Sequence, residues 1–163
     1  MLILGIDPGM AIVGYSVLKS GNSDLELVSS GSIQTCSDKS TPQRLLEIYE
    51  DMCTIIEKFK PDISSIEKLF YFKNQKTIIP VAEARGVILM ALEKYKIPIY
   101  EFTPLEVKQN LTGFGRADKK EVEKMVKITL NQENLPTLDD TVDSIAMAIC
   151  CHRCCVNSQL VKQ

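Results

Sequence analysis

Two short apolar segments, each ending in one carboxylate, constrain the fold of this chain more than any other feature. Residues 2–7 (LILGID) end in Asp7, and residues 63–67 (ISSIE) end in Glu67. Short apolar runs of this kind are typical of buried strands in an α/β sheet, whose strand ends gather chemistry at one edge. A carboxylate buried there is costly unless it is paired or bound to a metal. We therefore expect an α/β sheet with an acidic edge.

A second pair of acids opens a helical pattern near the C-terminal end of the sequence. Asp140 and Asp143 are three residues apart, so they share one face of the expected helix and border its apolar stripe. The four acids would repel one another if they met, and such a cluster implies a bound cation. Oxygen ligands favour Mg²⁺, which in turn indicates phosphate chemistry.

Each acid also has an ordinary structural explanation. Asp7 precedes Pro8-Gly9, an arrangement that is typical of a turn, and Glu67 stands next to Lys68, which suits a surface ion pair. Asp140 and Asp143 lie near a helix start, where a negative charge meets the helix dipole favourably. The metal hypothesis rests on all four acids together.

The order of the expected elements indicates a ribonuclease H-like α/β fold. Strands are predicted at 2–7, 14–20, 25–34, 63–67 and 98–102. Helices are predicted at about 42–59 (after a cap at Thr41), at 77–95, from Pro104 onward, at 118–130 and at 139–152. Short links between the first three strands imply antiparallel hairpins, so we expect a mixed five-stranded sheet with helices on both faces. We assign residues 1–155 to one domain and 156–163 to a short C-terminal tail.

The charge distribution is uneven along the chain. The net charge of the 163 residues is −2, yet residues 68–127 hold 12 Lys or Arg against 7 Asp or Glu. A basic middle segment beside an acidic pocket suits an enzyme that acts on a polyanion, and the alternative is a solvated surface of mixed sign. No apolar run is long enough for a membrane span, and the N-terminus lacks the features of a signal peptide. A cytoplasmic protein without a membrane partner is expected.

Several sequence blocks resemble the RuvC family of Holliday-junction resolvases. They occur in the family's order from Met1 to about His152 and read ILGIDPGMAIVGYSV, SIEKLFYFKN, ARGVIL, EFTPLEVKQNLTGFGRADK, MVK and DDTVDSIAMAICCH. The resemblance implies a homodimeric endonuclease that cuts four-way DNA junctions symmetrically and leaves 5′-phosphate and 3′-hydroxyl ends. It also implies two Mg²⁺ ions per active site, with Mn²⁺ as a substitute. Branch-migration proteins RuvA and RuvB would be further partners.

The resemblance assigns roles to particular side chains. The catalytic acids and metal ligands carry over to Asp7, Glu67, Asp140 and Asp143, with Asp7 as our choice for the ligand that bridges both ions. The DNA contacts implied or suggested by the basic segment are Phe70, Lys73, Lys76, Lys108, Arg116, Lys119 and Lys120. Phe70 would stack on a base at the junction centre, and core or dimer packing is its alternative role.

Two other functions and two departures from the family pattern also need a test. The other functions are a module that binds junctions without cutting them and a ribonuclease H-like nuclease that acts on RNA. The departures are Ala82 and Glu83, in a helix near the expected dimer contact, and the cysteine-rich segment ICCHRCC. Cys151 and Cys154 have the spacing of a zinc pair, with His152 or Cys155 as a third ligand, but one pair without a second favours reduced thiols. His152 is too far along its helix from Asp143 to serve as a general base.

Overall fold

The computed structural model of the chain describes residues 1–21, 24–69 and 78–160, with side chains of the last helix described as far as residue 155. The strands are β1 (Leu2–Asp7), β2 (Ile12–Ser20), β3 (Leu25–Gln34), β4 (Ile63–Glu67) and β5 (Ile99–Phe102). The helices are α1 (Thr41–Phe59), α2 (Ile78–Lys94), α3 (Pro104–Thr112), α4 (Lys119–Leu130) and α5 (Asp139–Leu160).

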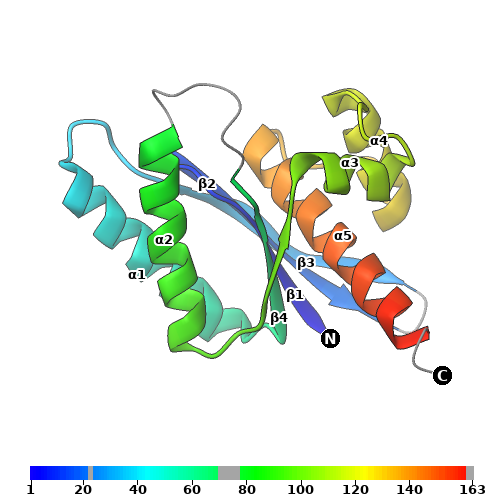
Figure 1. Cartoon of the computed structure of the whole chain (residues 1–163), viewed down its shortest axis with the longest axis horizontal. Coiled ribbons are helices and arrows are strands. Elements are labelled where there is room, and N and C mark those ends of the chain that lie inside the picture. Colours follow the sequence, from blue (N-terminus) through cyan, green and yellow to red (C-terminus); the bar gives the residue numbers. More distant parts are fainter. Residues whose placement is uncertain (22–23, 70–77, 161–163) are drawn as a thin grey trace.

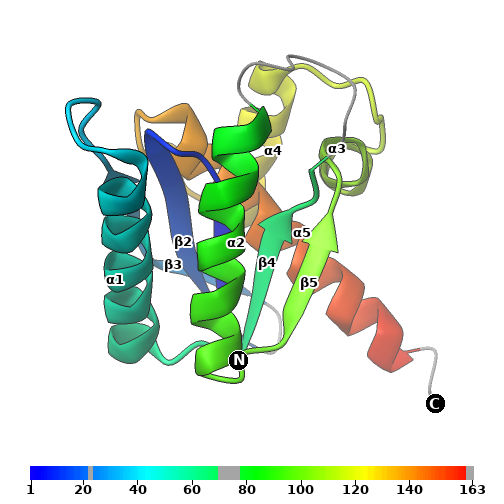
Figure 2. The same cartoon turned by 60° about the vertical axis from the view of Figure 1, so that its left-hand side comes forward.

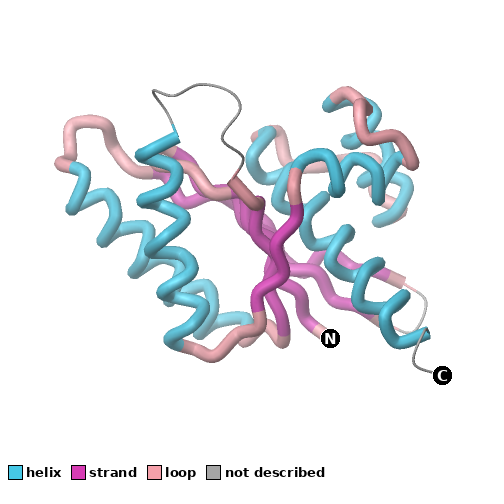
Figure 3. Tube along the Cα trace, viewed as in Figure 1, coloured by secondary structure: helices cyan, strands magenta, loops and turns pink. Residues whose placement is uncertain are grey.

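The strands form one mixed sheet in the order β3-β2-β1-β4-β5. The first three strands pair antiparallel, as their short links predict, while β4 pairs parallel to both β1 and β5. Helices α1 and α2 cover one face of the sheet, and α3, α4 and α5 lie on the other side (Figure 1). Figure 3 shows the strands between these two groups of helices. The predicted five-stranded mixed sheet with helices on both faces is therefore confirmed.

Alternation along β1 divides the core into two halves. Leu4 and Ile6 pack with the buried residues of α1 and α2. Ile3 packs with the buried residues of α5 on the opposite face. Because successive side chains of a strand point to opposite faces, Asp7 follows Ile3 and Gly5 toward the α5 side. The strand thus carries its acid to the face that α5 covers.

Two glycines let α5 lie directly on the sheet. A Cβ at Gly5 in β1 would stand 2.1 Å from the carbonyl oxygen of Ser144, and a Cβ at Gly14 in β2 would stand 2.0 Å from that of Asp140. Both distances are far below any permitted contact, so only glycine allows this approach. Gly14 is paired in register with Asp7. The close contact therefore fixes the start of α5 beside the end of β1.

Several predicted boundaries differ from the structure by one residue, and three differences concern a cap or a shift of two or more residues. β2 begins at Ile12, two residues before the predicted start at 14, because the pairing with β3 extends to Ile12 and Gln34. Ser40, rather than Thr41, is the N-cap of α1, and its backbone N–H donates to the Gln43 side chain. α5 continues to Leu160, beyond the predicted end at 152. Within the described residues, no helix is long and apolar enough to cross a membrane.

Candidate active site

The acids of β1 and β4 lie at the same edge of the sheet. The two strands run parallel, and Ile6 of β1 is paired in register with Ile66 of β4. Asp7 and Glu67 come next in each strand, so both stand at the carboxyl edge. Ile66 packs toward α1 and α2, whereas Ile63 packs toward α5, which by alternation turns Glu67 toward α5 as well. Parallel pairing and strand alternation together bring these two acids onto one side of one edge.

The start of α5 brings the other two acids to this edge, and both contribute to the shifted pKa of Asp7. Burial, the largest cause, and the nearby charge of Glu67 raise the pKa of Asp7 to about 8. Asp143 and Asp140 add to this shift, and Lys119 opposes it. Burial and then Asp143 raise the pKa of Glu67, and burial raises that of Asp143. The four predicted acids therefore form one interacting cluster.

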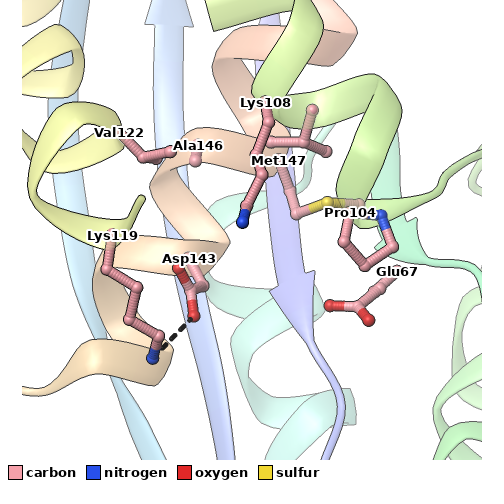
Figure 4. A pocket seen from close by; sticks show the side chains of 9 residues that line it. Glu67, Pro104, Lys108, Lys119, Val122, Asp143, Ala146 and Met147 are labelled. Carbon is pink, nitrogen blue, oxygen red and sulfur yellow. Dashed lines mark ion pairs between the residues drawn. The ribbon is translucent and has the colours of Figure 1, made fainter. Parts of the chain in front are cut away.

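A pocket of about 230 Å³ opens beside this cluster, between the end of β4 and helices α3, α4 and α5. Glu67 and Asp143 line it together with Lys108 and Lys119. Lys119 points toward Asp143, with Nζ 3.8 Å from Oδ2, and the ends of Lys108 and Glu67 also reach into the pocket (Figure 4). Lys119 and Lys108 both oppose the rise in the pKa of Asp143. Two ammonium groups and two carboxylates thus share one small, open space.

Capping interactions hold the two lysines in place. Thr103 is the N-cap of α3: its hydroxyl accepts from the Glu106 backbone N–H, while the Glu106 carboxylate accepts from the Thr103 N–H. Asp118 and Glu121 make the same reciprocal pair at the start of α4. Such capping boxes fix where a helix begins. They set Lys119 in the first turn of α4, facing the start of α5.

The donor set suits a hard divalent cation. All four side chains offer carboxylate oxygens, the ligands that Mg²⁺ prefers. Burial and then repulsion by the other acids raise the pKa of Asp7, and a bound cation would offset both effects. In the described part of the chain, however, no group of three or more His, Cys, Asp or Glu side chains is close enough together to hold an ion as it stands. Asp143 instead pairs with Lys119. The chemistry of the site fits a metal, although its acids are not gathered into a finished ligand group.

Comparison with known proteins agrees with this geometry. Residues 3–152 match the family described as crossover junction endodeoxyribonuclease RuvC. The chain belongs to the RuvC family. The RuvC of Petrotoga mobilis is 49% identical over 150 residues, covering 92% of each chain. That of Caldicellulosiruptor saccharolyticus is 46% identical over 151 residues, covering 92% of this chain and 91% of the relative. RuvC nucleases depend on divalent metal ions.

A solved RuvC structure has the same fold. Thermus thermophilus RuvC in complex with a Holliday junction substrate superposes with a TM-score of 0.86 at 28% identity, covering 92% of each chain. This likeness extends over the sheet and its helices, so the ribonuclease H-like prediction is confirmed. When the molecule is turned by 60°, β4 and β5 are seen side by side, with α2 in front of the sheet and α5 behind it (Figure 2).

Only some of the residues predicted to contact DNA lie within the described part of the chain. Phe70, Lys73 and Lys76 lie outside the described residues. Lys108 and Lys119 line the pocket beside Glu67 and Asp143, and their contact with DNA stays a prediction. Two further basic residues, Arg116 and Lys120, are exposed on the same α3–α4 side but do not line the pocket.

Two polar residues at the site were not found from the sequence. Asp139 accepts a hydrogen bond of 3.2 Å from Lys119, so this lysine bridges two acids of α5. Arg85 of α2 donates to the backbone carbonyl of Glu67 at 3.0 Å and pairs with Glu101. The run Asp139-Asp140 could have indicated the first. The second joins α2, β4 and β5, and no local pattern predicts it.

The cysteine-rich segment lies in α5, and its cysteines form no disulfide. Cys150 interacts with Cys154 and Cys151 with Cys155, in pairs four residues apart along one helix. No disulfide joins any of the six cysteines, all of which lie within the described residues, and no cluster among those residues is able to hold zinc. His152 is half-buried, and burial lowers its pKa. The thiol interactions along this helix are therefore chiefly those of the i, i+4 pairs, and reduced thiols stay the prediction for this segment.

Proposed function

We propose that this chain is the endonuclease that resolves four-way DNA (Holliday) junctions in recombination and repair. It hydrolyses one phosphodiester in each of two opposed strands and leaves 5′-phosphate and 3′-hydroxyl ends. The observation that carries the proposal is the convergence of Asp7, Glu67, Asp140 and Asp143 at one edge of the sheet in a member of the RuvC family. A binding module that does not cut has no need for four mutually repelling carboxylates.

The four acids would hold two Mg²⁺ ions per site, and Mn²⁺ would substitute. Asp7 extends from the central strand and is within electrostatic reach of the other three acids, which suits a ligand shared by both ions. Glu67 and Asp143 would hold opposite ions, and Asp140 would complete a shell. When bound, the ions lower the pKa of the attacking water and neutralise charge at the scissile phosphate.

The chain's own cations would hold the substrate strand. Lys108 and Lys119 face the acids across the pocket and would contact phosphate oxygens next to the scissile bond. Arg116 and Lys120 would bind the backbone further along the arm. Lys73 and Lys76 would be further backbone contacts, and Phe70 would stack on a base at the junction centre. Contacts to phosphates fix register without reading sequence, which suits selection of a DNA shape.

A second copy of the chain would complete the enzyme, because a four-way junction has two-fold symmetry and presents two strands of like polarity. The outer face of α2 supports this. It exposes a stripe at helical spacing that carries one charge among apolar or small residues: Ile79, Ala82, Glu83, Gly86 and Met90. The residues that depart from the family pattern, Ala82 and Glu83, are exposed within this stripe. We also propose that the enzyme works in the cytoplasm and that RuvA and RuvB deliver its junctions.

Cleavage of a synthetic four-way junction, compared with a linear duplex of the same sequence, tests the function. We expect paired nicks in the junction with Mg²⁺ and no cutting of the duplex or of an RNA–DNA hybrid. Asp7→Asn should abolish cleavage and leave junction binding intact, whereas Asp51→Asn, on the exposed side of α1, should change neither. Equal cutting of junction and duplex would overturn the proposal.

A further inference from the structure

A second pocket lies on the other side of the start of α5. It has a volume of about 450 Å³ and is lined by the β1–β2 turn from Gly9, by Arg44 of α1, by Pro80 and by Asp140. The pocket that holds Lys108 and Lys119 is lined by Asp143. Because Asp143 and Glu67 line one pocket and Asp140 lines the other, each pocket borders the acidic cluster from a different set of elements. A strand laid across the acids would enter both of them.

Arg44 is fixed in this second pocket by a chain of hydrogen bonds. Its Nε donates to the hydroxyl of Thr35 at 2.8 Å, and that hydroxyl donates to the carbonyl oxygen of Met10 at 2.6 Å. Thr35 is buried, and its backbone N–H is bonded to Ala11. The half-buried guanidinium is therefore tied through Nε to the turn that follows β1, while its two terminal nitrogens are not used by this chain of bonds.

The charge of Arg44 has no structural explanation within the fold. Among the described residues, no carboxylate makes an ion pair with it, although Asp140 lines the same pocket. Arg44 also lies in the first turn of α1, which contains no acidic residue, and a cation there is opposed by the helix dipole. An anion in the pocket would satisfy the guanidinium and would be favoured by that dipole.

We infer that Arg44 and its pocket bind a phosphate of the cleaved strand, on the opposite side of the scissile bond from Lys108 and Lys119. The ligand is a backbone phosphodiester, held by the terminal nitrogens of a guanidinium whose Nε is already bonded to Thr35. Fork-shaped pairing of this kind suits arginine, and lysine would reproduce only its charge. This inference rests on the proposed nuclease function and adds a positioning contact to it.

Three variants at this pocket and one control test the contact. Arg44→Gln should lower kcat/KM for junction cleavage by about 10- to 100-fold, the range expected for a charged hydrogen bond. It should also reduce the slope of log binding constant against log salt by about 1. Arg44→Lys should recover only part of the loss, and Thr35→Val should lose less than Arg44→Gln. Lys58→Gln, the same charge change at the exposed far end of α1, should leave both quantities unchanged.

A methylphosphonate scan identifies the phosphate directly. Neutralising single phosphates next to the scissile bond should reveal one whose loss slows the wild-type enzyme, and Arg44→Gln should be insensitive to that substitution alone. If no flanking phosphate matters to the wild type, or if Arg44→Gln responds to every position as the wild type does, the site does not exist. A wild-type chain that fails to cut any junction would instead overturn the proposed function.

Discussion

Asp7 is the residue at which the fold and the proposed chemistry oppose each other. Its pKa is raised to about 8, chiefly by burial and then by Glu67, so the folded protein binds a proton at this position more tightly than the unfolded chain does. Stability linked to Asp7 is therefore greatest when the carboxyl is protonated. It falls as the pH rises from about 4, the ordinary value for Asp, to about 8, and is constant above that.

Asp7→Asn should stabilise the metal-free protein at alkaline pH. The amide has the same shape and no charge, so the repulsion with Glu67 and Asp143 disappears. The full shift would correspond to about 6 kcal/mol, but the coupling is shared and the side chain is only partly buried, so we expect a gain of about 1–3 kcal/mol at pH 8.5.

Denaturant titrations in EDTA at pH 4 and pH 8.5 measure this gain. The difference between the two proteins should be small at pH 4, where the wild-type carboxyl is protonated in the folded state and about half protonated in the unfolded chain. Adding Mg²⁺ at pH 8.5 should stabilise the wild type and leave the variant unchanged, a readout of metal binding that needs no DNA. An equal response of both proteins to Mg²⁺ would show that Asp7 is not a ligand.

The sequence was enough to select all four acids, yet not enough to describe how they interact. Apolar runs that end in Asp7 and Glu67 have a local pattern, and so do two acids three residues apart. The ion pair of Lys119 with Asp139 and the bond from Arg85 to the Glu67 carbonyl join separate elements. Such partners depend on where the helices pack on the sheet, and the periodicity of apolar residues in the sequence does not specify those packing positions.

At the scale of the elements, the contact between α5 and the sheet decides whether the site forms. Strand order and helix positions follow from periodicity and turn residues, and they were predicted apart from a few boundaries. The depth at which α5 lies was not predicted, because a glycine within a strand has several explanations. Only the structure reveals that Gly5 and Gly14 face backbone carbonyls of α5.

Gly14→Ala tests this contact. The new methyl group would meet the Asp140 carbonyl at 2.0 Å, so the start of α5 must move away from β2. We expect a loss of about 3 kcal/mol in the free energy of unfolding, as for overpacking elsewhere. Cleavage should fall by about 100-fold or more, since displacement of catalytic groups by about 1 Å is enough for that.

Gly21→Ala provides the matched control for the same chemical change. Among the described residues, a Cβ there would meet the Asp24 carbonyl oxygen at 3.4 Å, an ordinary contact, and nothing closer. Its stability should stay within about 0.5 kcal/mol of the wild type, with unchanged cleavage. If Gly14→Ala behaves like this control, close packing of α5 is not what positions Asp140.

For the molecule as a whole, the two faces of the sheet have different tasks. The α5 side carries the acids, Lys108 of α3 and the basic helix α4, whereas the α1–α2 side presents the apolar stripe of α2. A junction that must be cut at two symmetric points needs two active sites held at a fixed spacing. Because the two faces are separate, the α5 side would bind DNA while the α1–α2 side forms the contact between the two copies of the chain.

Ile79→Glu should convert the proposed dimer into monomers. The side chain is 65% exposed in the isolated chain, so the fold should tolerate a charge there, whereas two unpaired charges buried across a two-fold interface would each cost several kcal/mol. Light scattering should show the mass fall from twice 18.2 kDa to 18.2 kDa. Ile128→Glu, at a site 60% exposed on α4, should leave the mass unchanged.

The monomeric Ile79→Glu variant should give singly nicked junctions in place of paired nicks. Paired nicks from a monomer would show that one copy is sufficient and that the α2 stripe has another use.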